Sequence, residues 1–182
     1  VYARSATQPV HKGRFQDISG AWWELREIIV VPEHFGGFNV GNAQPGVADW
    51  LDYLQLVPQA RGHVPSRVYR LDSQLPDITR RVRIEGKSRS GSGFIRNYNS
   101  AANKGVFTIT PDATGDPNGS IFEGFYINAA AGTTGGAAIA LYSTATTALS
   151  SIILRALTLS TFGVNTWSNT ILANGTAKVN NV

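Results

Sequence analysis

The sequence predicts an all-β chain folded as a short solenoid, a parallel β-helix of about four to five rungs. The first observation behind this prediction is composition: only 15% of the 182 residues are charged, and 19 are Gly. That balance is typical of β-rich proteins with many turns. The second is a repeat of two short apolar segments around a charged residue and a small one. The third is the set of turn-forming segments between the expected strands.

The repeat is clearest in Ile121–Asn128, which aligns without gaps on Ile153–Ser160, and Arg83–Ser88 is an earlier partial copy. In each copy an apolar residue is followed by a charged residue and then by Gly or Ala. Glu123 and Gly124 interrupt an otherwise apolar strand in this way. A charge beside a tiny residue predicts a corner, where the chain turns and a neighbouring coil passes close by.

The chain divides into two parts, the second of which begins with a helix. Residues 1–35 are predicted to be an N-terminal attachment arm, and residues 36–182 a β-helix domain. Within that domain, residues 47–57 place apolar side chains on one stripe at helical spacing, after Pro45 and Gly46. We expect this helix to cap the open first end of the solenoid.

The rungs are expected from about residue 67 onward. The segments interpreted as strands are RVYRLDSQL, TRRVRIEGKS, GVFTIT, SIFEGFYIN, AAIALYST, SSIILRALTLS and NTILAN. The segments between them, such as PDATGDPNG, are rich in turn-forming residues.

Several classes of protein are excluded by what the sequence lacks. With no Cys, the chain has neither a disulfide framework nor a thiolate metal site. It contains no apolar run of membrane-spanning length and no signal peptide at its start. It also lacks Met, so we expect it to be a piece of a longer protein.

Positive charge is concentrated in one segment. Residues 61–104 hold ten Lys or Arg and three acids, whereas the whole chain has a net charge of +4. A basic belt of this kind attracts polyanions. The alternative interpretation is a solvated charged face of a strand, which the sequence favours because no aromatic residues alternate with the basic ones for stacking. No nucleic-acid partner is expected.

From Pro32 to about Asn174 the chain resembles the pectate-lyase-like right-handed parallel β-helix family of bacteriophage tailspikes. VVPEHFGG is similar to the P-x-x-F-G-A opening of those domains, and an amphipathic helix, ADWLDYLQ, follows. HVPSRVYRL resembles the strand that begins the helix, RVRIEGKS the next rung, and GVFTI, IFEGFYIN and IILRALTLS later ones. The resemblance implies a right-handed helix and a homotrimer.

The chain departs from that family in two ways. Many relatives carry an acidic DGvtDDt stretch before the helix, whereas this chain has NVGNAQPGVAD, which keeps only Asp49. The second departure is length: tailspikes that cleave polysaccharide usually have many more rungs than the four to five expected here, and a C-terminal trimerising region.

Carboxylates are the candidate catalytic groups, because glycoside cleavage generally uses two of them across the bond. The candidates are Glu85 and Glu123, which could align on one face at the corners, and Asp112 and Asp116, which share one loop. The alternatives are a solvated corner with Glu123 near Arg155, and plain turn-forming aspartates. We find no cofactor or metal motif, and no carboxylate cluster for the calcium that lyases of this fold use.

Two functions remain open. The first is a non-enzymatic virion tail component, a tailspike or tail or baseplate receptor-binding protein, which attaches to the host surface and recognises its glycans. The alternative is the N-terminal portion of a tailspike polysaccharide depolymerase, a glycoside hydrolase or lyase. A bacterial surface adhesin of the same fold is a third reading that the order of the motifs disfavours.

The arm is the expected contact with partners. Trp22, Trp23, Ile28 and Ile29 give it more apolar surface than a free tail exposes. We expect it to pack against a neighbouring subunit of a homotrimer or against other phage tail or baseplate proteins.

Overall fold

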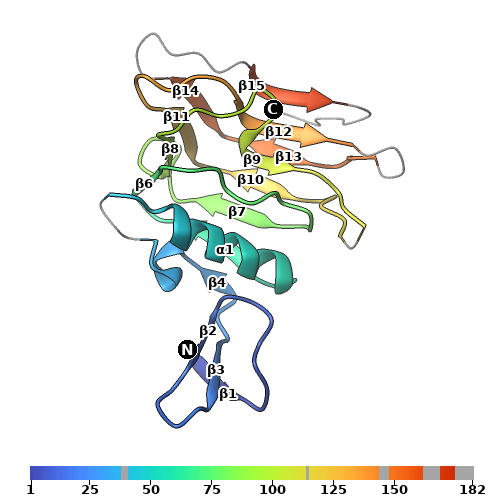
Figure 1. Cartoon of the computed structure of the whole chain (residues 1–182). Coiled ribbons are helices and arrows are strands. Elements are labelled where there is room, and N and C mark those ends of the chain that lie inside the picture. The colour runs from blue at the N-terminus through green and yellow to red at the C-terminus, as the bar shows by residue number, and fades with distance from the viewer. Residues whose placement is uncertain (38–40, 114, 144–147, 162–168, 175–182) are drawn as a thin grey trace.

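The computed structural model describes the chain except for residues 38–40, 114, 144–147, 162–168 and 175–182 (Figure 1). Strands dominate the described part, which confirms the prediction of a β-rich fold. The strands are β1 (Tyr2–Ser5), β2 (Arg14–Gln16), β3 (Trp22–Leu25), β4 (Ile29–Val30), β5 (Arg61–Val64), β6 (Val68–Leu71), β7 (Arg83–Gly86), β8 (Gly93–Arg96), β9 (Gly105–Ile109), β10 (Ile121–Glu123), β11 (Tyr126–Ala129), β12 (Ala137–Tyr142), β13 (Ile153–Arg155), β14 (Thr158–Thr161) and β15 (Asn169–Asn174). The helices are the 3-10 helix η1 (Pro32–Phe35) and the α-helix α1 (Gln44–Leu56).

Three sheets are parallel, with strand orders β13-β10-β7-β5-β4, β14-β11-β8-β6 and β15-β12-β9. The chain visits them in turn, so β7, β8 and β9 form one coil, β10, β11 and β12 the next, and β13, β14 and β15 another. The sheets are open and stack above α1 (Figure 1). A fourth sheet, β1-β3-β2, is antiparallel and lies at the N-terminal end.

The strand register confirms the repeat read from the sequence. Phe122 in β10 lies opposite Leu154 in β13, and opposite Ile84 in β7 on its other side. In the next sheet Ile127 pairs with Leu159. The aligned sequence positions are therefore neighbours in space, one coil apart.

Gly124 lies between β10 and β11, where the sequence predicts a corner. Its φ is +74°, a left-handed conformation that suits glycine. Its N–H donates to the carbonyl oxygen of Arg155 at 3.1 Å. Ala156, at the aligned position of the next coil, also has a positive φ, of 52°. The corner is thus a repeated backbone feature that links successive coils.

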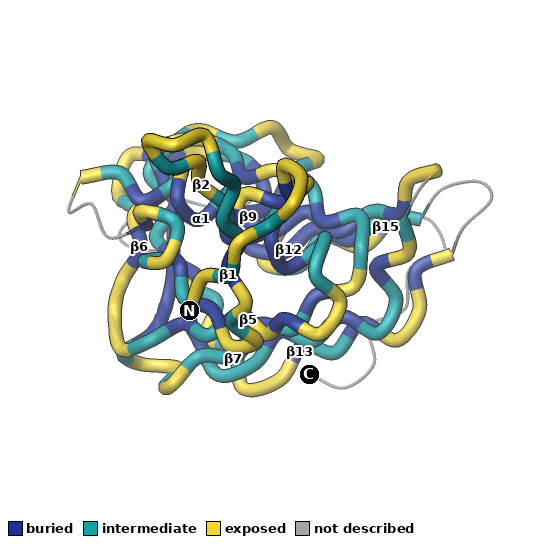
Figure 2. The backbone as a smooth tube through the Cα atoms, turned by 90° about the horizontal axis from the view of Figure 1, so that it is seen from below, coloured by how far each residue is buried: buried dark blue, intermediate teal, exposed yellow. Residues whose placement is uncertain are grey.

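The core lies between the three parallel sheets. Ile84, Phe122 and Leu154 point inward from the first sheet and are buried. Their neighbours are buried rings, and Phe94 contacts Phe107 edge to face with ring centroids 5.1 Å apart. Figure 2, seen from below, shows buried stretches such as β9 and β12 in dark blue, with exposed turns at the outside. Stacked apolar columns of this kind form one continuous hydrophobic core.

Helix α1 is the predicted amphipathic helix, and it begins three residues earlier than the expected 47–57. Trp50 and Leu54 face β5, where a side chain on Gly62 would clash, because an added Cβ would lie 2.4 Å from Trp50 Cζ2. The indole of Trp50 donates to the carbonyl oxygen of Val30 at 3.0 Å. The helix therefore packs over the first parallel strands. In the described part of the chain, no helix has the length and apolar character needed to cross a membrane.

The strand boundaries differ from the predicted ones at two places. Within residues 36–182 the first parallel strand is β5, which begins at Arg61, earlier than the expected residue 67, and β8 is absent from the predicted strands. β4 lies within the predicted arm of residues 1–35, yet it pairs with β5 in the first parallel sheet. The arm is therefore joined to the parallel strands through β4, and its remaining strands form the antiparallel sheet.

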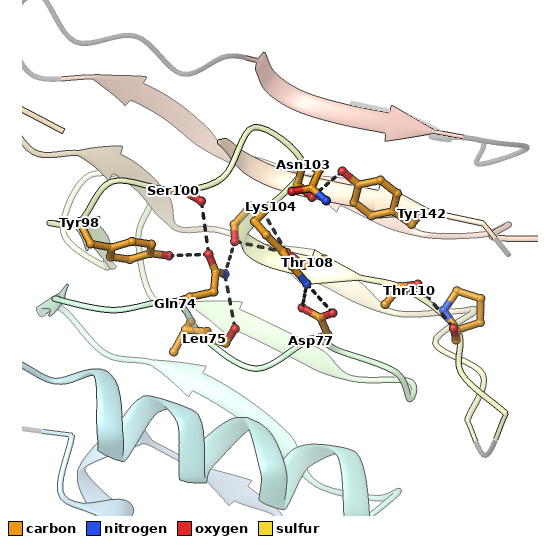
Figure 3. A network of polar contacts seen from close by, with 12 residues as sticks. Gln74, Leu75, Asp77, Tyr98, Ser100, Asn103, Lys104, Thr108, Thr110 and Tyr142 are labelled. Carbon is orange, nitrogen blue, oxygen red and sulfur yellow. Dashed lines mark hydrogen bonds and ion pairs between the residues drawn. The ribbon is translucent and has the colours of Figure 1, made fainter. Parts of the chain in front are cut away.

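Side-chain contacts join neighbouring coils where the chain leaves the strands (Figure 3). The amide of Gln74 donates to the carbonyl oxygen of Gly105 at 2.7 Å and accepts from Tyr98 and Ser100, each at 3.3 Å. Lys104 reaches both carboxylate oxygens of Asp77, at 2.8 and 2.7 Å. These contacts hold the connection after β6 against the following coil.

Candidate functional site

The predicted acids Glu85 and Glu123 lie directly opposite each other on β7 and β10. Their column continues to His63 on β5 and to Arg155 on β13. The prediction that the two glutamates share one face is therefore confirmed. They form the middle of a ladder of titratable and charged side chains across four strands.

Each of these glutamates has an arginine partner. Arg83 pairs with Glu85 on the same strand. Arg155 Nη2 donates to Glu123 Oε2 at 2.5 Å, which confirms the contact expected from the repeat. That hydrogen bond and the charge of Glu123 raise the pKa of Arg155. This arrangement is typical of a charge-paired strand face.

Asp112 and Asp116 lie elsewhere, in the connection between β9 and β10, and both are exposed. Asp116 Oδ1 accepts from the backbone N–H of Asn118 at 2.9 Å, a turn-forming contact two residues along the chain. The structure does not place these aspartates on the strand face of Glu85 and Glu123.

The aromatic residues predicted for partner contact are engaged within the arm. Trp23 stacks on Phe15 with centroids 6.3 Å apart and donates to Asp17 Oδ2 at 2.8 Å. Hydrogen bonds from Ser19 and Trp23 lower the pKa of Asp17 to about 2. Trp22 is half-buried on the same strand. The side chain of Trp23 therefore supports the antiparallel sheet, whereas Trp22 joins it through the backbone pairing with Ser5 and Gln16.

Ile28 and Ile29 remain open to solvent, with 56% and 60% of their surface exposed. Ile28 precedes β4 and Ile29 is its first residue, and β4 is an edge strand of the first parallel sheet. An exposed apolar pair beside an edge strand is a suitable surface for another chain.

The basic segment 61–104 divides into paired and unpaired cations. Ion pairs join Arg67 to Glu33, Arg70 to Asp72, Arg83 to Glu85 and Lys104 to Asp77. Arg96 is fully buried and contacts Gly135 and Thr133, and burial lowers its pKa. The interpretation as a solvated strand face therefore holds for only part of the segment.

A groove on the outward face of the second parallel sheet is the best candidate for ligand contact. We call it the Tyr126 groove, and its volume is about 370 Å³. It is lined by Arg89, Ser90, Tyr126, Asn128, Thr158 and Ser160. These residues come from three separate parts of the chain that the stacking of the coils brings together.

The alternation of β11 turns Tyr126 and Asn128 outward, because Ile127 between them is buried in the core. Gly93 lies opposite Tyr126, and a Cβ added there would lie 2.6 Å from the tyrosine ring. The missing side chain thus leaves room for the ring against the sheet. Burial raises the pKa of Tyr126.

Polar groups surround this ring. Ser160 donates to Asn128 Oδ1 from the adjacent strand, and Thr158 lies opposite Tyr126. Arg89 is exposed and makes no ion pair within the described part of the chain. A half-buried ring beside hydroxyl, amide and guanidinium groups can contact both the apolar face and the hydroxyl edge of a sugar.

Sequence reasoning did not identify the Tyr126 groove. One signal was present: Tyr126 and Asn128 align with Thr158 and Ser160 at outward positions of the repeat. Arg89 and Ser90 carry no comparable signal, because they lie in a turn whose neighbours are set by folding. Among the described residues, no three His, Asp or Glu side chains are grouped so that they could hold a metal ion.

Comparison with models of known protein families and with curated proteins found no match to this chain.

Proposed function

We propose that this chain is a β-helical component of a phage virion tail, a tailspike or tail or baseplate receptor-binding protein that recognises host-surface glycans. The support for the β-helix is the coil arrangement, in which three parallel sheets each receive one strand per coil. The matched register of Phe122 with Ile84 and Leu154 agrees with it. The packing of α1 on β5 is consistent with a cap on the first coil. The support for the phage tail is the order of the motifs from Pro32 to Asn174.

The observation that carries glycan recognition is the Tyr126 groove. Sugar rings present an apolar C–H face and a rim of hydroxyl groups, so their sites combine an aromatic ring with polar side chains. Tyr126 supplies the ring, and Thr158 and Ser160 supply hydroxyl groups on the same sheet face. Asn128 is largely buried beneath them, and its Oδ1 accepts from Ser160. The rigid parallel strands fix these groups without a loop rearrangement.

A binding role fits the glutamate pair better than catalysis does. Glu85 and Glu123 each contact an arginine, which favours stable ion pairs over a free acid and base. The depolymerase alternative keeps one supporting observation, the direct opposition of the two carboxylates on neighbouring strands. Adjacent strands lie about 4.8 Å apart, close to the carboxyl separation of retaining glycosidases.

The experiment that tests glycan recognition compares Tyr126→Ala with Tyr142→Ala against an array of bacterial surface polysaccharides. Tyr142 is a tyrosine of the same coil on a different sheet, so it controls for loss of a ring. We expect Tyr126→Ala to lower affinity for a bound glycan by at least about tenfold and Tyr142→Ala to leave it unchanged. Equal affinities of the two variants, or no binding of the unaltered chain, would contradict the proposal.

A second measurement separates binding from cleavage. The unaltered chain and the Glu85→Gln/Glu123→Gln variant are incubated with the bound polysaccharide, and new reducing or unsaturated ends are counted. The proposal expects neither protein to release such ends. Release by the unaltered chain alone would establish the depolymerase alternative.

The virion assignment has its own test. Peptides of this chain are expected in purified phage particles analysed by mass spectrometry. Their absence from particles whose genome encodes the chain would contradict a structural role in the tail.

A further inference from the structure

A second groove lies on the outward side of the first parallel sheet, and three arginines line it. We call it the arginine groove. It is lined by Arg61, Arg81 and Arg83 together with Pro58, Gln59, Ala60 and Val82, and its volume is about 270 Å³. Its lining contains no acidic residue.

The strand register places these arginines together. Gly62 on β5 lies opposite Ile84 on β7, so the preceding residues, Arg61 and Arg83, are neighbours across the two strands. Val82 and Ile84 point inward and are buried, and therefore Arg81 and Arg83 project outward on either side of Val82.

Backbone and side-chain contacts fix two of the three guanidinium groups. Arg81 donates from Nε to the carbonyl oxygen of Gly119 at 3.1 Å. Arg83 donates from Nε to Glu85. In both cases the contact uses Nε, so terminal nitrogens remain available as donors. A positioned guanidinium loses less freedom when it binds an anion than a free one does.

The positive charge of the arginine groove is only partly balanced by neighbouring acidic side chains. In the described part of the chain, neither Arg61 nor Arg81 makes an ion pair, and Glu85 is the acid in contact with Arg83. Clustered like charges repel one another, and an anion placed between them relieves this repulsion. Guanidinium groups bind carboxylate and sulfate oxygens through paired, charge-assisted hydrogen bonds.

We propose that the arginine groove binds the anionic group, a carboxylate or a sulfate ester, of an acidic polysaccharide. The proposal rests on the proposed glycan recognition and deepens it by naming the class of glycan. A polysaccharide is favoured over a single-stranded nucleic acid because no aromatic ring lines the groove, so bases have nothing on which to stack.

The test uses matched ligands and matched charge variants. The ligands are a hyaluronan tetrasaccharide, which carries carboxylates, and its carboxyl-reduced form, which is neutral and otherwise the same. The variants are Arg61→Gln/Arg81→Gln and the control Arg4→Gln/Lys87→Gln. Both remove two positive charges, but Arg4 and Lys87 lie outside the groove. Affinities are measured by calorimetry at 0.15 M salt, and folding is checked by thermal melting.

We expect the unaltered chain and the control variant to prefer the acidic tetrasaccharide by at least about tenfold. The arginine-groove variant should lose this preference. Equal loss in both variants would overturn the proposal, because it would indicate an effect of net charge alone. Tighter binding of an oligothymidylate than of the acidic sugar, abolished only in the arginine-groove variant, would overturn it in favour of nucleic acid.

An additional measurement distinguishes failure of this inference from failure of the proposed function. Sodium sulfate is titrated while the side-chain Nε–H signals of the arginines are followed by NMR. Shifts of the Arg61 and Arg81 signals that saturate together support an anion site even where neither sugar binds. Unchanged signals alongside binding of the neutral sugar would overturn the arginine groove and leave the Tyr126 groove intact.

Discussion

A Cβ atom on Gly124 would lie 2.7 Å from the carbonyl oxygen of Gly86, one coil below. Two glycines are thus in close backbone contact at the corner between the first and second parallel sheets. The contact explains why glycine follows the charged residue in the first two copies of the repeat.

We predict that Gly124→Val destabilises the fold by about 2–4 kcal/mol, because it combines a strained positive φ with a backbone clash. The control is Gly132→Val, where φ is also positive, at +85°, but no atom lies within 4 Å of an added Cβ. This variant should lose only about 1–2 kcal/mol. Urea unfolding of both proteins measures the difference, and equal losses would rule out the steric part of the argument.

Ala156 occupies the same corner of the next coil at a positive φ of 52°. We predict that Ala156→Gly increases stability by up to about 1 kcal/mol, because relief of the left-handed strain outweighs the added entropy of the unfolded chain. Ala138→Gly, at a buried strand position, should instead destabilise by about 0.5–1 kcal/mol. A loss of stability in Ala156→Gly would show that the alanine side chain contributes more than its strain costs.

His11 joins the antiparallel sheet to α1. Its ring meets Tyr53 edge on at 4.8 Å, Nε2 lies 3.6 Å from Glu24, and burial lowers its pKa below the usual 6.5. The unfolded chain therefore binds this proton more readily than the folded chain does. The neutral imidazole contributes stability above about pH 6.5. This contribution is lost as the pH falls from there towards the lower pKa that His11 has in the folded chain.

The corresponding measurement is the free energy of unfolding at pH 7.5 and pH 5. We predict that His11→Phe, which keeps a ring against Tyr53, loses less stability on acidification than the unaltered chain. His34→Gln, which removes an exposed histidine, is the matched control for loss of one imidazole. A His11→Phe profile parallel to that of the unaltered chain would contradict the assignment.

The oligomer is predicted to be a homotrimer in which the exposed residues Ile28 and Ile29 contact a neighbouring subunit. Replacing both with Ser should shift the mass in native mass spectrometry from trimer towards monomer. The control is Val10→Ser/Ile18→Ser, which removes two other exposed apolar side chains of the arm. A well-folded monomer of the unaltered chain at micromolar concentration would disprove the trimer.

The repeated strands could be predicted from the sequence. Strands whose apolar pattern is interrupted by a glycine that tertiary contacts require could not. β10 with β11 and β13 with β14 share a visible alignment, so their neighbours could be identified. β5 and β8 contain Gly62 and Gly93, which weaken a strand pattern. Both glycines are explained by contacts from elsewhere in the chain, with Trp50 and with Tyr126.

The same distinction applies to the candidate sites. The opposition of Glu85 and Glu123, and the pairing of Glu123 with Arg155, follow from aligned repeat positions and were predicted. The Tyr126 groove and the arginine groove each combine strand residues with residues of a turn. Which turn residues lie beside which strand residues depends on the length of each connection. No local sequence pattern predicts that placement.

Successive coils differ in length without losing their alignment. Ser120 bonds to Val82, 38 residues earlier, whereas Arg155 bonds to Glu123 across only 32. The difference is taken up outside the paired strands, in connections that can lengthen or shorten while the inward columns stay in place. The paired strands therefore form a common scaffold, and the connections carry the differences in length and surface chemistry between coils.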